Sequence, residues 1–218
     1  MSRLRVHTMS MSVDGFVAGP SQSLENPLGV GGEGLHRWIF MTPTGRRMTG
    51  ADGDTADDDP VDEHFVAAGF DNIGAWILGR NMFGPIRGKW GDSDWSGWWG
   101  DTPPYHCEVF VLTHHARTSL EMDGGTTFYF VDAPIADVRE RAIEAAGGRD
   151  VRIGGGASTV RQFMAAGLVD DVHFAIVPVL LGGGERLFEP DTDPYPGYEC
   201  VAYRPSKHVA HVQLAKRG

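Results

Sequence analysis

Three consecutive glycines follow a short β-branched run that ends at Ile153, and a stretch with helical periodicity comes next. Glycine permits positive φ and a close approach of the backbone to a ligand. The first turn of a helix adds unpaired N–H groups and the positive end of the helix dipole. The segment Gly154, Gly155, Gly156, Ala157 and Ser158 therefore suits a phosphate group. It fits a tight strand-to-helix turn without a ligand equally well, so both interpretations stay open.

This turn is not a complete dinucleotide fingerprint. The pattern G-x-G-x-x-G requires a third glycine, and Thr159 occupies that position. A doubly wound dinucleotide domain also carries its glycine turn after its first strand, whereas this turn lies late in the chain. Any dinucleotide therefore binds in a different fold.

A second glycine turn, Gly79-Arg80-Asn81-Met82, follows the buried-strand pattern of residues 75–78 and opens a predicted helix. Arg80 has the wrong charge for the start of a helix but the right charge for a bound phosphate. An exposed arginine is the common alternative.

A third candidate group lies after the predicted strand of residues 109–112. Leu112 and Thr113 precede two histidines, His114 and His115, and Arg117 follows them. A hydroxyl, an imidazole and a guanidinium group can together hold a phosphate monoester. Adjacent histidines in an extended chain point to opposite sides, so we expect no metal site.

Three acidic positions also stand out in the sequence. Asp14 lies in an Asp-Gly turn, where a role in binding nearby backbone N–H groups is favoured over a role as substrate ligand. Glu63, with Asp62 beside it, falls in the first turn of a predicted helix over residues 61–69, where the helix dipole favours carboxylates. Glu185 follows the glycines of residues 182–184.

Strands and helices alternate through the middle of the chain, and these elements must position the candidate residues. We expect strands at residues 4–13, 16–18, 75–78, 109–112, 127–131, 171–177, 199–203 and 208–214. A further helix over residues 134–146 takes Asp132 as its cap and ends at Gly147. The pattern predicts an α/β fold: a single-domain, three-layer structure with a mixed, mostly parallel central sheet, helices on both faces and a C-terminal antiparallel hairpin.

Residues 19–60 form a long insertion that is weakly structured in this prediction, with one short helix near Trp38. An acidic run lies near the end of this insertion and just beyond it. Its spacing does not match a calcium-binding loop, so it indicates a solvated linker. Its residues are Asp52, Asp54, Asp57, Asp58, Asp59, Asp62 and Glu63. The tryptophans at 90, 95, 98 and 99 form another cluster. They can stack on a flat ligand, contact a partner subunit or cap the core.

The composition limits the function classes. The chain has 218 residues and a formal net charge of -10, which argues against general nucleic-acid binding. It has no apolar run long enough to span a membrane, and its first residues lack a signal pattern, so we expect a cytoplasmic protein. The two cysteines, Cys107 and Cys200, are expected to be free thiols.

The order of these motifs resembles the dihydrofolate reductase superfamily, and in particular the branch with the reductase domain of the bifunctional riboflavin-biosynthesis deaminase-reductase. The resemblance rests on Ser12–Ala18, Leu78–Phe83, Val111–His114 and Ile153–Gly156, and on Gly167–Asp171 with Pro178–Gly182. These motifs cover nearly the whole chain, so the resemblance implies one domain over residues 1–218. The deaminase half is absent, and so is the segment that holds the ribose phosphate in riboflavin reductases.

The resemblance implies an NADPH-dependent oxidoreductase, often a homodimer, that transfers a hydride to a pterin-like, aminopyrimidine-like or carbonyl substrate. The residues that it places at the cofactor are Ala18, Gly19, Gly79, Arg80, Asn81, Met82, Leu112, Thr113, His114 and Ile153 to Ser158. It places the proton-donating acid near Glu63, with Asp14 and Glu185 as further candidates. Glu63 is either a semi-buried acid that can donate a proton or an exposed carboxylate in the first turn of its helix. A non-catalytic nucleotide-binding or sensor protein and a flavin or deazaflavin binder remain as alternatives.

Overall fold

The computed structural model describes residues 2–51, 53, 55–84, 88–90, 94–189, 195 and 197–217. The chain divides into two compact units. Unit one comprises Met1–Val6 and Asn72–Asp170, and unit two comprises His7–Asp71 and Asp171–Gly218. Strand β1 (Leu4–Ser12) contributes its first residues to unit one and the remainder to unit two. The expectation of one domain over residues 1–218 stays a prediction.

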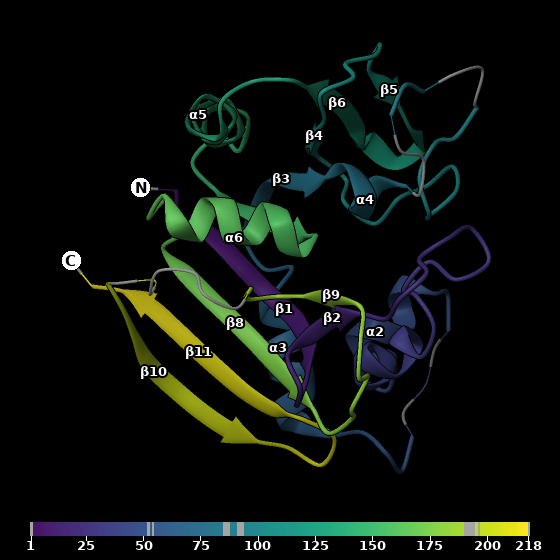
Figure 1. Cartoon of the computed structure of the whole chain (residues 1–218), viewed down its shortest axis with the longest axis vertical. Coiled ribbons are helices and arrows are strands. Elements are labelled where there is room, and N and C mark those ends of the chain that lie inside the picture. Colours follow the sequence, from purple (N-terminus) through teal and green to yellow (C-terminus); the bar gives the residue numbers. More distant parts are fainter. Residues whose placement is uncertain are drawn as a thin grey trace. The chain divides into compact units, whose positions relative to one another are not determined.

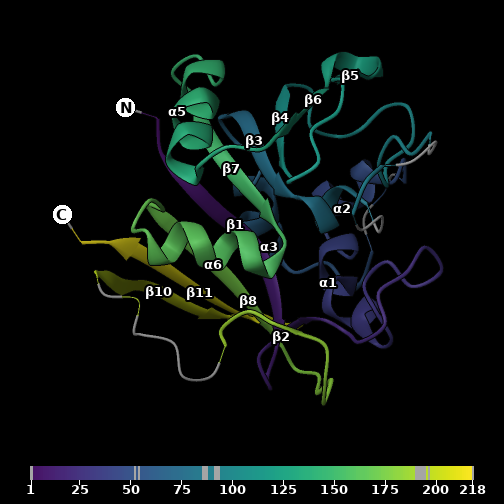
Figure 2. The same cartoon turned by 45° about the horizontal axis from the view of Figure 1, so that its top comes forward.

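Unit one is built on a mostly parallel sheet. Its strand order is β1, β7 (Asp150–Gly155), β3 (Ile73–Gly79), β4 (Glu108–Leu112), β6 (Thr127–Val131) and β5 (Leu120–Glu121). Only the short β5 runs antiparallel to its neighbour. Figure 2 shows β7, β3 and β4 side by side. Because parallel strands end at the same edge of a sheet, the ends of β7, β3 and β4 bring three predicted motifs together.

The helices of unit one are α4 (Arg80–Phe83), α5 (Ile135–Ala145), α6 (Ala157–Ala165) and the 3-10 turn η2 (Asp123–Gly125). Val138 and Ala142 on α5 and Phe163 on α6 are fully buried, so one face of each helix packs inward. Gly147 has φ 57°, which confirms that a left-handed glycine follows α5. The predicted cap of this helix is wrong: Pro134 precedes it, and Asp132 instead contacts His114.

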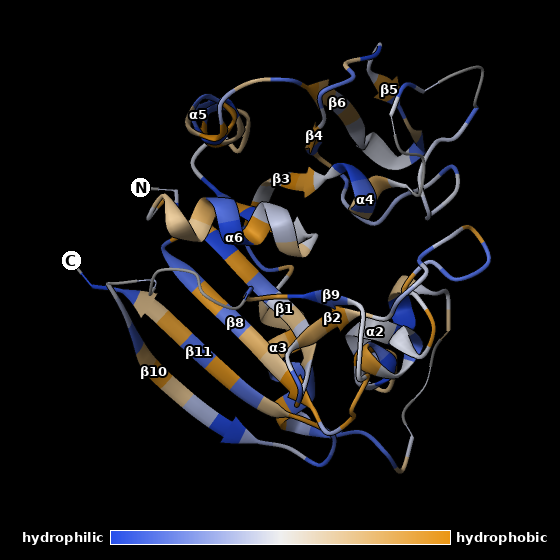
Figure 3. Cartoon of the chain, in the orientation of Figure 1, coloured by the Kyte–Doolittle hydropathy of each residue, from blue (hydrophilic) through white to orange (hydrophobic). Residues whose placement is uncertain are grey.

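Unit two carries the antiparallel end of the chain. Its strand order is β10 (Tyr198–Pro205), β11 (Ala210–Lys216), β8 (Asp171–Val177) and β1, and β11 runs antiparallel to both neighbours (Figure 1). A separate small sheet pairs β2 (Phe16–Ala18) with β9 (Glu185–Arg186). Figure 3 shows hydrophobic residues along β8 and β11. The α/β class, the mixed and mostly parallel sheet and the C-terminal antiparallel strands are thus confirmed.

Residues 19–60 are more ordered than the sequence suggested. They contain η1 (Gly32–Leu35), α1 (Arg37–Phe40) and α2 (Pro43–Met48), and α3 (Pro60–Ala68) follows. Leu35 and Trp38 belong to the core of unit two, together with Val66, Ala175, Val177 and Val209. The expectation of a largely structureless insertion is therefore wrong for the described residues, since this apolar patch packs under α3.

The acidic run is also only partly a solvated linker. Arg46 donates two hydrogen bonds to the Asp58 carboxylate, at 2.7 and 3.0 Å, and Asp59 caps α3 by accepting from the Val61 N–H at 2.8 Å. Asp62 has no exposed surface. Each of these carboxylates has a specific structural partner, which composition alone does not reveal. Asp52 and Asp54 lie outside the described residues.

Two further expectations concern the whole chain. Cys107 and Cys200 are free thiols, as predicted. None of the helices described here combines the length and the apolar character that crossing a membrane requires. The cytoplasmic location stays a prediction.

Candidate cofactor and proton-transfer sites

Arg80 is held firmly at the end of β3. Its Nη1 donates to Thr113 Oγ1 at 2.9 Å and its Nη2 to the Gly88 carbonyl at 3.1 Å. The guanidinium carbon lies 3.2 Å from the centre of the Trp90 ring, within the range of a cation–π contact. The interpretation of Arg80 as a freely exposed arginine is therefore wrong. A cation fixed in advance loses less conformational entropy when it binds an anion.

Gly79 is needed because a larger residue would not fit, and not because the backbone is left-handed there. Its backbone is extended, with φ -73°, and a Cβ atom at this position would lie 2.4 Å from Thr159 Oγ1 and 3.2 Å from the Gly156 nitrogen. The end of β3 therefore packs directly against the start of α6. Thr159, which replaces the third glycine of the dinucleotide fingerprint, is buried in this contact.

The three glycines at the end of β7 have different surroundings. A Cβ atom on Gly154 would lie 2.5 Å from Leu78 Cδ2, so this position has no room. Gly155 has φ +121°, a conformation that other residues rarely adopt. At Gly156 a Cβ atom would meet nothing within 4 Å. The turn is thus closely packed beneath Gly154 and open at Gly156, and the peptide bond between Gly155 and Gly156 is cis.

Helix α6 begins directly after this open position. Its N-cap residue is Gly156, no side chain caps the end, and its first turn carries no acidic residue. Ala157 is fully buried, whereas Ser158 is exposed. The start of α6 therefore presents backbone N–H groups and a positive dipole end without a competing side chain, which suits an anion.

The end of β4 places a hydroxyl and an imidazole beside the same edge. Thr113 is buried, and its Oγ1 also accepts from the His115 N–H at 3.1 Å. The His114 side chain is 94% exposed, and its Nδ1 lies 3.2 Å from Asp132 Oδ1. Register pairs Gly79 with Leu112 and Leu78 with Gly155, so the three strand ends adjoin one another.

The remaining predicted cofactor residues differ in what they can offer. Met82 is 38% exposed, and its sulfur would lie 3.8 Å from a Cβ atom on Gly155. Asn81 and Leu112 are half-buried, but Ile153 is only 1% exposed. Ile153 therefore supports the turn from the core, and only its backbone can face a ligand.

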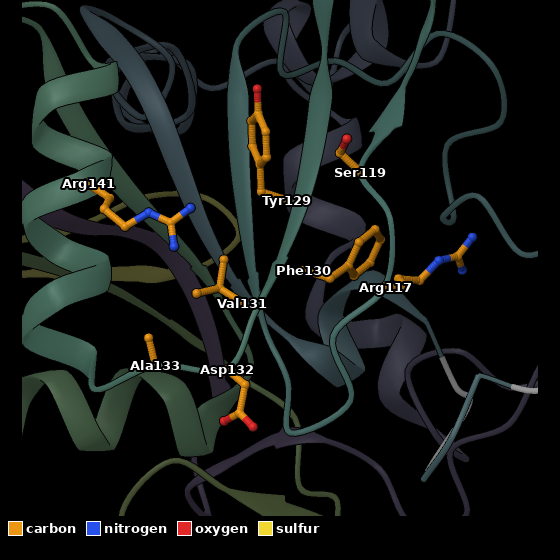
Figure 4. Close-up of a pocket in the computed structure, with 8 residues that line it drawn as sticks. All are labelled: Arg117, Ser119, Tyr129, Phe130, Val131, Asp132, Ala133 and Arg141. Atoms are coloured by element: carbon orange, nitrogen blue, oxygen red, sulfur yellow. The ribbon is translucent and has the colours of Figure 1, made fainter.

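A separate cavity of about 350 Å³ lies beside β6, and the sequence did not predict it. Figure 4 shows its eight lining residues: Arg117, Ser119, Tyr129, Phe130, Val131, Asp132, Ala133 and Arg141. Its connection to the strand ends is Asp132, the partner of His114. Arg117, expected as a phosphate ligand, donates to the Trp95 carbonyl at 3.3 Å.

The tryptophan cluster packs mainly against its own unit. Trp95 donates its indole N–H to the Phe83 carbonyl at 3.0 Å, and the rings of Trp95 and Trp98 meet edge to face at 4.7 Å. One face of Trp90 is covered by Arg80, and its indole N–H donates to the His115 carbonyl. These contacts favour the core-capping interpretation of the cluster.

In unit two, Asp14 fastens a distant loop. Its carboxylate accepts from Ser12 Oγ at 2.6 Å, from the Gly182 N–H at 2.7 Å and from the Leu181 N–H at 3.2 Å. The Ser12 hydrogen bond, helped by the two amides, lowers the pKa of Asp14 to about 2. The carboxylate binds backbone N–H groups, but the expectation that these groups are nearby in the chain is wrong, because they lie 167 and 168 residues away. An acid of such low pKa is a poor proton donor at neutral pH.

Three further candidates of unit two, Ala18, Gly19 and Glu185, lie in or beside the small sheet of β2 and β9. Ala18 pairs with Glu185 across β2 and β9, and Glu185 is half-buried. A Cβ atom on Gly184 would lie 2.0 Å from the Ala18 carbonyl oxygen, so only glycine allows this approach. Gly19 donates its N–H to the Leu28 carbonyl at 2.8 Å. Their predicted position near a nicotinamide stays a prediction.

The two acids at the start of α3 have different surroundings. Glu63 accepts from the Thr44 N–H at 2.9 Å and from Thr44 Oγ1 at 2.6 Å, so it fastens α2 to α3. Asp62 is fully buried, and its Oδ1 lies 2.8 Å from His211 Nε2. Glu63 is half-buried and both of its carboxyl oxygens are engaged by Thr44, whereas Asp62 beside it is fully buried. Across the described residues, no group of three or more His, Cys, Asp or Glu side chains is arranged to hold a metal ion.

Comparison with known proteins agrees with this architecture. The family model for the RibD C-terminal domain matches residues 6–201. The chain belongs to the RibD C-terminal domain family. Over 94 residues it is 32% identical to the uncharacterized protein YyaP of Bacillus subtilis strain 168, a match that covers 40% of this chain and 48% of YyaP. The chain thus spans about half the length of that relative.

Solved structures share the fold of this RibD C-terminal domain protein at low identity. A protein from Shewanella sp. PV-4 named for riboflavin biosynthesis has a TM-score of 0.60 and 19% identity, with all of both chains covered. RibD of Acinetobacter baumannii has a TM-score of 0.57 and 15% identity over all of this chain and 59% of its own. Dihydrofolate reductase of Enterococcus faecalis, solved with NADP(H), has a TM-score of 0.51 and 13% identity over 99% of this chain and 97% of its own.

Sequence reasoning missed one group in this RibD C-terminal domain protein. His173 on β8 and His211 on β11 are fully buried, and their facing nitrogens lie 3.0 Å apart. Each histidine stands within an apolar strand, which is the one signal that the sequence offered. Their pairing depends on the antiparallel register of β8 and β11, which a sequence pattern does not specify.

Proposed function

We propose that this RibD C-terminal domain protein is an NADPH-dependent reductase of a small heterocyclic or carbonyl substrate. The observation that carries the proposal is the shared edge of β3, β4 and β7. There, a fixed arginine, a buried threonine hydroxyl and an uncapped helix start lie together. The family membership and the fold shared with reductases support the same conclusion.

The residues at this edge fit a phosphorylated dinucleotide. Gly154, Gly155 and Gly156 with the start of α6 would hold the pyrophosphate, because the open space at Gly156 admits a ligand next to backbone N–H groups. Arg80, Thr113 and His114 would bind the phosphate that distinguishes NADPH from NADH. When bound, the cofactor supplies the hydride.

The protein's part in the reaction is to orient the substrate and provide a proton. Asp14 and Glu63 accept hydrogen bonds from the Gly182 and Thr44 N–H groups and so connect separate segments. Glu185 pairs with Ala18 across the small sheet, and Asp62 is hydrogen-bonded to His211. Asp62 has no exposed surface, whereas Glu185 is half-buried, so Glu185 is the carboxyl that a substrate can reach. A pterin, an aminopyrimidine and a carbonyl compound are the substrate classes to test.

Cofactor titration tests the proposal directly. We expect the purified protein to bind NADPH more tightly than NADH, with tryptophan fluorescence as the readout because Trp90 contacts Arg80. Arg80→Gln should weaken NADPH binding by roughly 10-fold or more while changing NADH binding little, since a charge-assisted contact contributes about 1.5–3 kcal/mol. Arg204→Gln, on exposed β10, is the control. Equal affinities for NADPH and NADH in the wild type would contradict the cofactor assignment.

Turnover separates the proposal from its alternative. A non-catalytic nucleotide-binding protein of the same fold would bind NADPH at the same edge but would not oxidise it with any substrate of these classes. A flavin binder is disfavoured by the packing of the tryptophan cluster on its own unit. The homodimer expected by resemblance stays a prediction, which sedimentation analysis of the same sample would test.

A further inference from the structure

The cavity beside β6 begins where the pairing of β5 with β6 ends. The last residue pair of these two strands, in the direction in which β6 runs, is Leu120 with Phe128. The cavity has a volume of about 350 Å³ and is lined by residues of the two segments beyond this pair, 117–119 and 129–133, and by Arg141 of α5. All of these residues belong to unit one. The cavity therefore occupies a gap beside an incompletely paired strand.

The backbone of Phe130 faces this gap. The Val131 carbonyl accepts from the Thr113 N–H at 3.0 Å, so Val131 directs its hydrogen-bonding groups toward β4. Neighbouring residues of a strand direct these groups to opposite edges, so the N–H and C=O groups of Phe130 point away from β4. On that side β5 pairs with β6 only as far as Phe128. An open strand edge of this kind can pair with the backbone of another extended segment.

Arg141 places a positive charge beside the same gap. Figure 4 shows its guanidinium group directed from α5 toward Val131, whereas the guanidinium group of Arg117 points away from Val131. The guanidinium carbon of Arg141 lies 5.5 Å from the centre of the Phe110 ring, and the Tyr129 ring stacks on that ring at 5.5 Å. Within the described part of the chain, no carboxylate pairs with Arg141. Such an arginine can bind a ligand carboxylate through two parallel hydrogen bonds.

The other polar groups of the cavity wall differ in what they leave for a ligand. Oδ1 of Asp132 lies 3.2 Å from Nδ1 of His114, and Arg117 donates to a backbone carbonyl at 3.3 Å, so both groups are already engaged. The hydroxyl groups of Ser119 and Tyr129 make no hydrogen bond to another of the described residues. The cavity thus offers a guanidinium group and two hydroxyl groups, which favours an anionic ligand.

We propose that this cavity binds an extended, peptide-like ligand of about dipeptide size that carries a carboxylate. The ligand amide continues the sheet by pairing with the backbone of Phe130, and its carboxylate binds Arg141. The volume is near the lower limit for ligand pockets, which sets the size of the ligand. None of the lining residues is among those assigned to the cofactor, so the proposal does not depend on the proposed reductase function.

A pair of small probes tests both halves of the recognition. The first probe is acetyl-Ala-Ala with a free carboxylate, and its C-terminal amide is the matched control. In ¹⁵N-labelled protein the first probe should shift the Phe130 N–H signal and slow its hydrogen exchange, because this group becomes hydrogen-bonded. Loss of the carboxylate should weaken binding by about 10-fold or more. Equal binding of the two probes, or no binding of either, would overturn the proposal.

A third probe tests the pairing with the strand edge. Acetyl-Ala-Ala methylated on both alanine nitrogens keeps the carboxylate but cannot donate to the Phe130 carbonyl, so we expect binding weaker by about 10-fold or more. Inorganic phosphate at the same concentration should not displace the first probe. If the methylated probe binds as well as the first, or if phosphate displaces it, the cavity recognises only an anion and the proposal is wrong.

A charge variant of the protein tests the role of Arg141. Arg141→Gln should bind the carboxylate probe and its amide equally weakly, while Arg149→Gln, which removes an exposed arginine of unit one outside the cavity, should bind as the wild type does. The same loss in both variants would show a general effect of charge and contradict the assignment. Slow exchange of the Phe130 N–H without probe, increasing with protein concentration, would show that a second copy covers this edge instead.

Titration in the presence of NADPH separates this site from the proposed function. Saturating NADPH should leave the affinity for the carboxylate probe unchanged, and competition between the two would show that the cavity belongs to the cofactor site. If the protein binds the probe but not NADPH, the cofactor assignment is overturned and the peptide-like site stands. If it binds NADPH but not the probe, the opposite holds.

Discussion

His211 Nε2 lies 2.8 Å from Asp62 Oδ1, and neither side chain has exposed surface. The pair joins the last strand of the chain to the start of α3, 149 residues earlier. Its contribution to folding can be measured apart from any role in catalysis.

Removal of the Asp62 carboxyl should destabilise unit two. In Asp62→Ala the His211 N–H is left buried without an acceptor, which costs about 1–3 kcal/mol in the free energy of unfolding. Denaturant unfolding followed by circular dichroism measures the change. Asp57→Ala removes an exposed carboxylate that pairs with Lys207, and we expect a loss of about 0–1 kcal/mol there. Similar losses in the two variants would contradict the view that the buried contact matters more.

The glycines at the predicted phosphate site should separate folding from binding. Gly79→Ala would place a methyl group 2.4 Å from Thr159 Oγ1, so we expect it to destabilise unit one by about 1–3 kcal/mol, as overpacking does. Gly156→Ala has no atom within 4 Å of its new methyl group, so we expect near-native stability but NADPH binding at least 10-fold weaker.

Gly183→Ala is the matched control for Gly156→Ala, because it also meets nothing within 4 Å. It belongs to unit two and is not one of the residues predicted to bind the cofactor. Thermal unfolding and NADPH titration of all three variants give the comparison. Unchanged NADPH affinity in Gly156→Ala would show that the open space beside the turn is not a ligand site.

Thr113 should affect cofactor choice through Arg80. Thr113→Val keeps the shape of the side chain but removes the Oγ1 that accepts from Arg80 Nη1 and from the His115 N–H. We expect a loss of about 0.5–1.5 kcal/mol in NADPH binding and a smaller preference of the protein for NADPH over NADH. Thr118→Val, on an exposed residue, is the control. Loss of NADH and NADPH binding to the same extent would argue for general damage to the site.

The Asp14 contacts should give a defined pH dependence. Because the Ser12, Gly182 and Leu181 hydrogen bonds lower its pKa from 3.8 to about 2, the unfolded state binds a proton more readily than the folded state. The stabilisation by Asp14 is therefore complete above pH 3.8 and is lost as the pH falls to about 2. The difference in unfolding free energy between wild type and Asp14→Asn should shrink over this range. A difference that grows on acidification would contradict the assigned contacts.

The two thiols should react at different rates. Burial raises the pKa of Cys107 to about 11, which keeps it protonated at neutral pH, whereas Cys200 is exposed on β10. Because the thiolate is the reactive form, Cys200 should react with a thiol reagent much faster than Cys107. Absorbance on reaction with Ellman's reagent gives the two rates, and Cys200→Ser should abolish the fast phase.

The amino-acid sequence by itself determined the positions of most strands and helices and the motifs at the strand ends. The apolar run of residues 75–78 is a fully buried strand, and the glycine turn of residues 154–156 leads into α6 as expected. These features are local: periodicity and glycine act within a few residues, so they can be recognised without the fold. The order of five such motifs was enough to identify the superfamily.

The tertiary structure alone decided which polar groups meet. Asp14 binds amides 167 and 168 residues away, and Arg46 is buried because Asp58 neutralises it. His173 and His211 face each other only because β8 and β11 pair in one particular register. A shift of either strand by one residue would turn its own histidine to the opposite face of the sheet. Partners that are distant in sequence and fixed by strand register leave no local signal, which is why the buried Asp–His–His chain was found only in the fold.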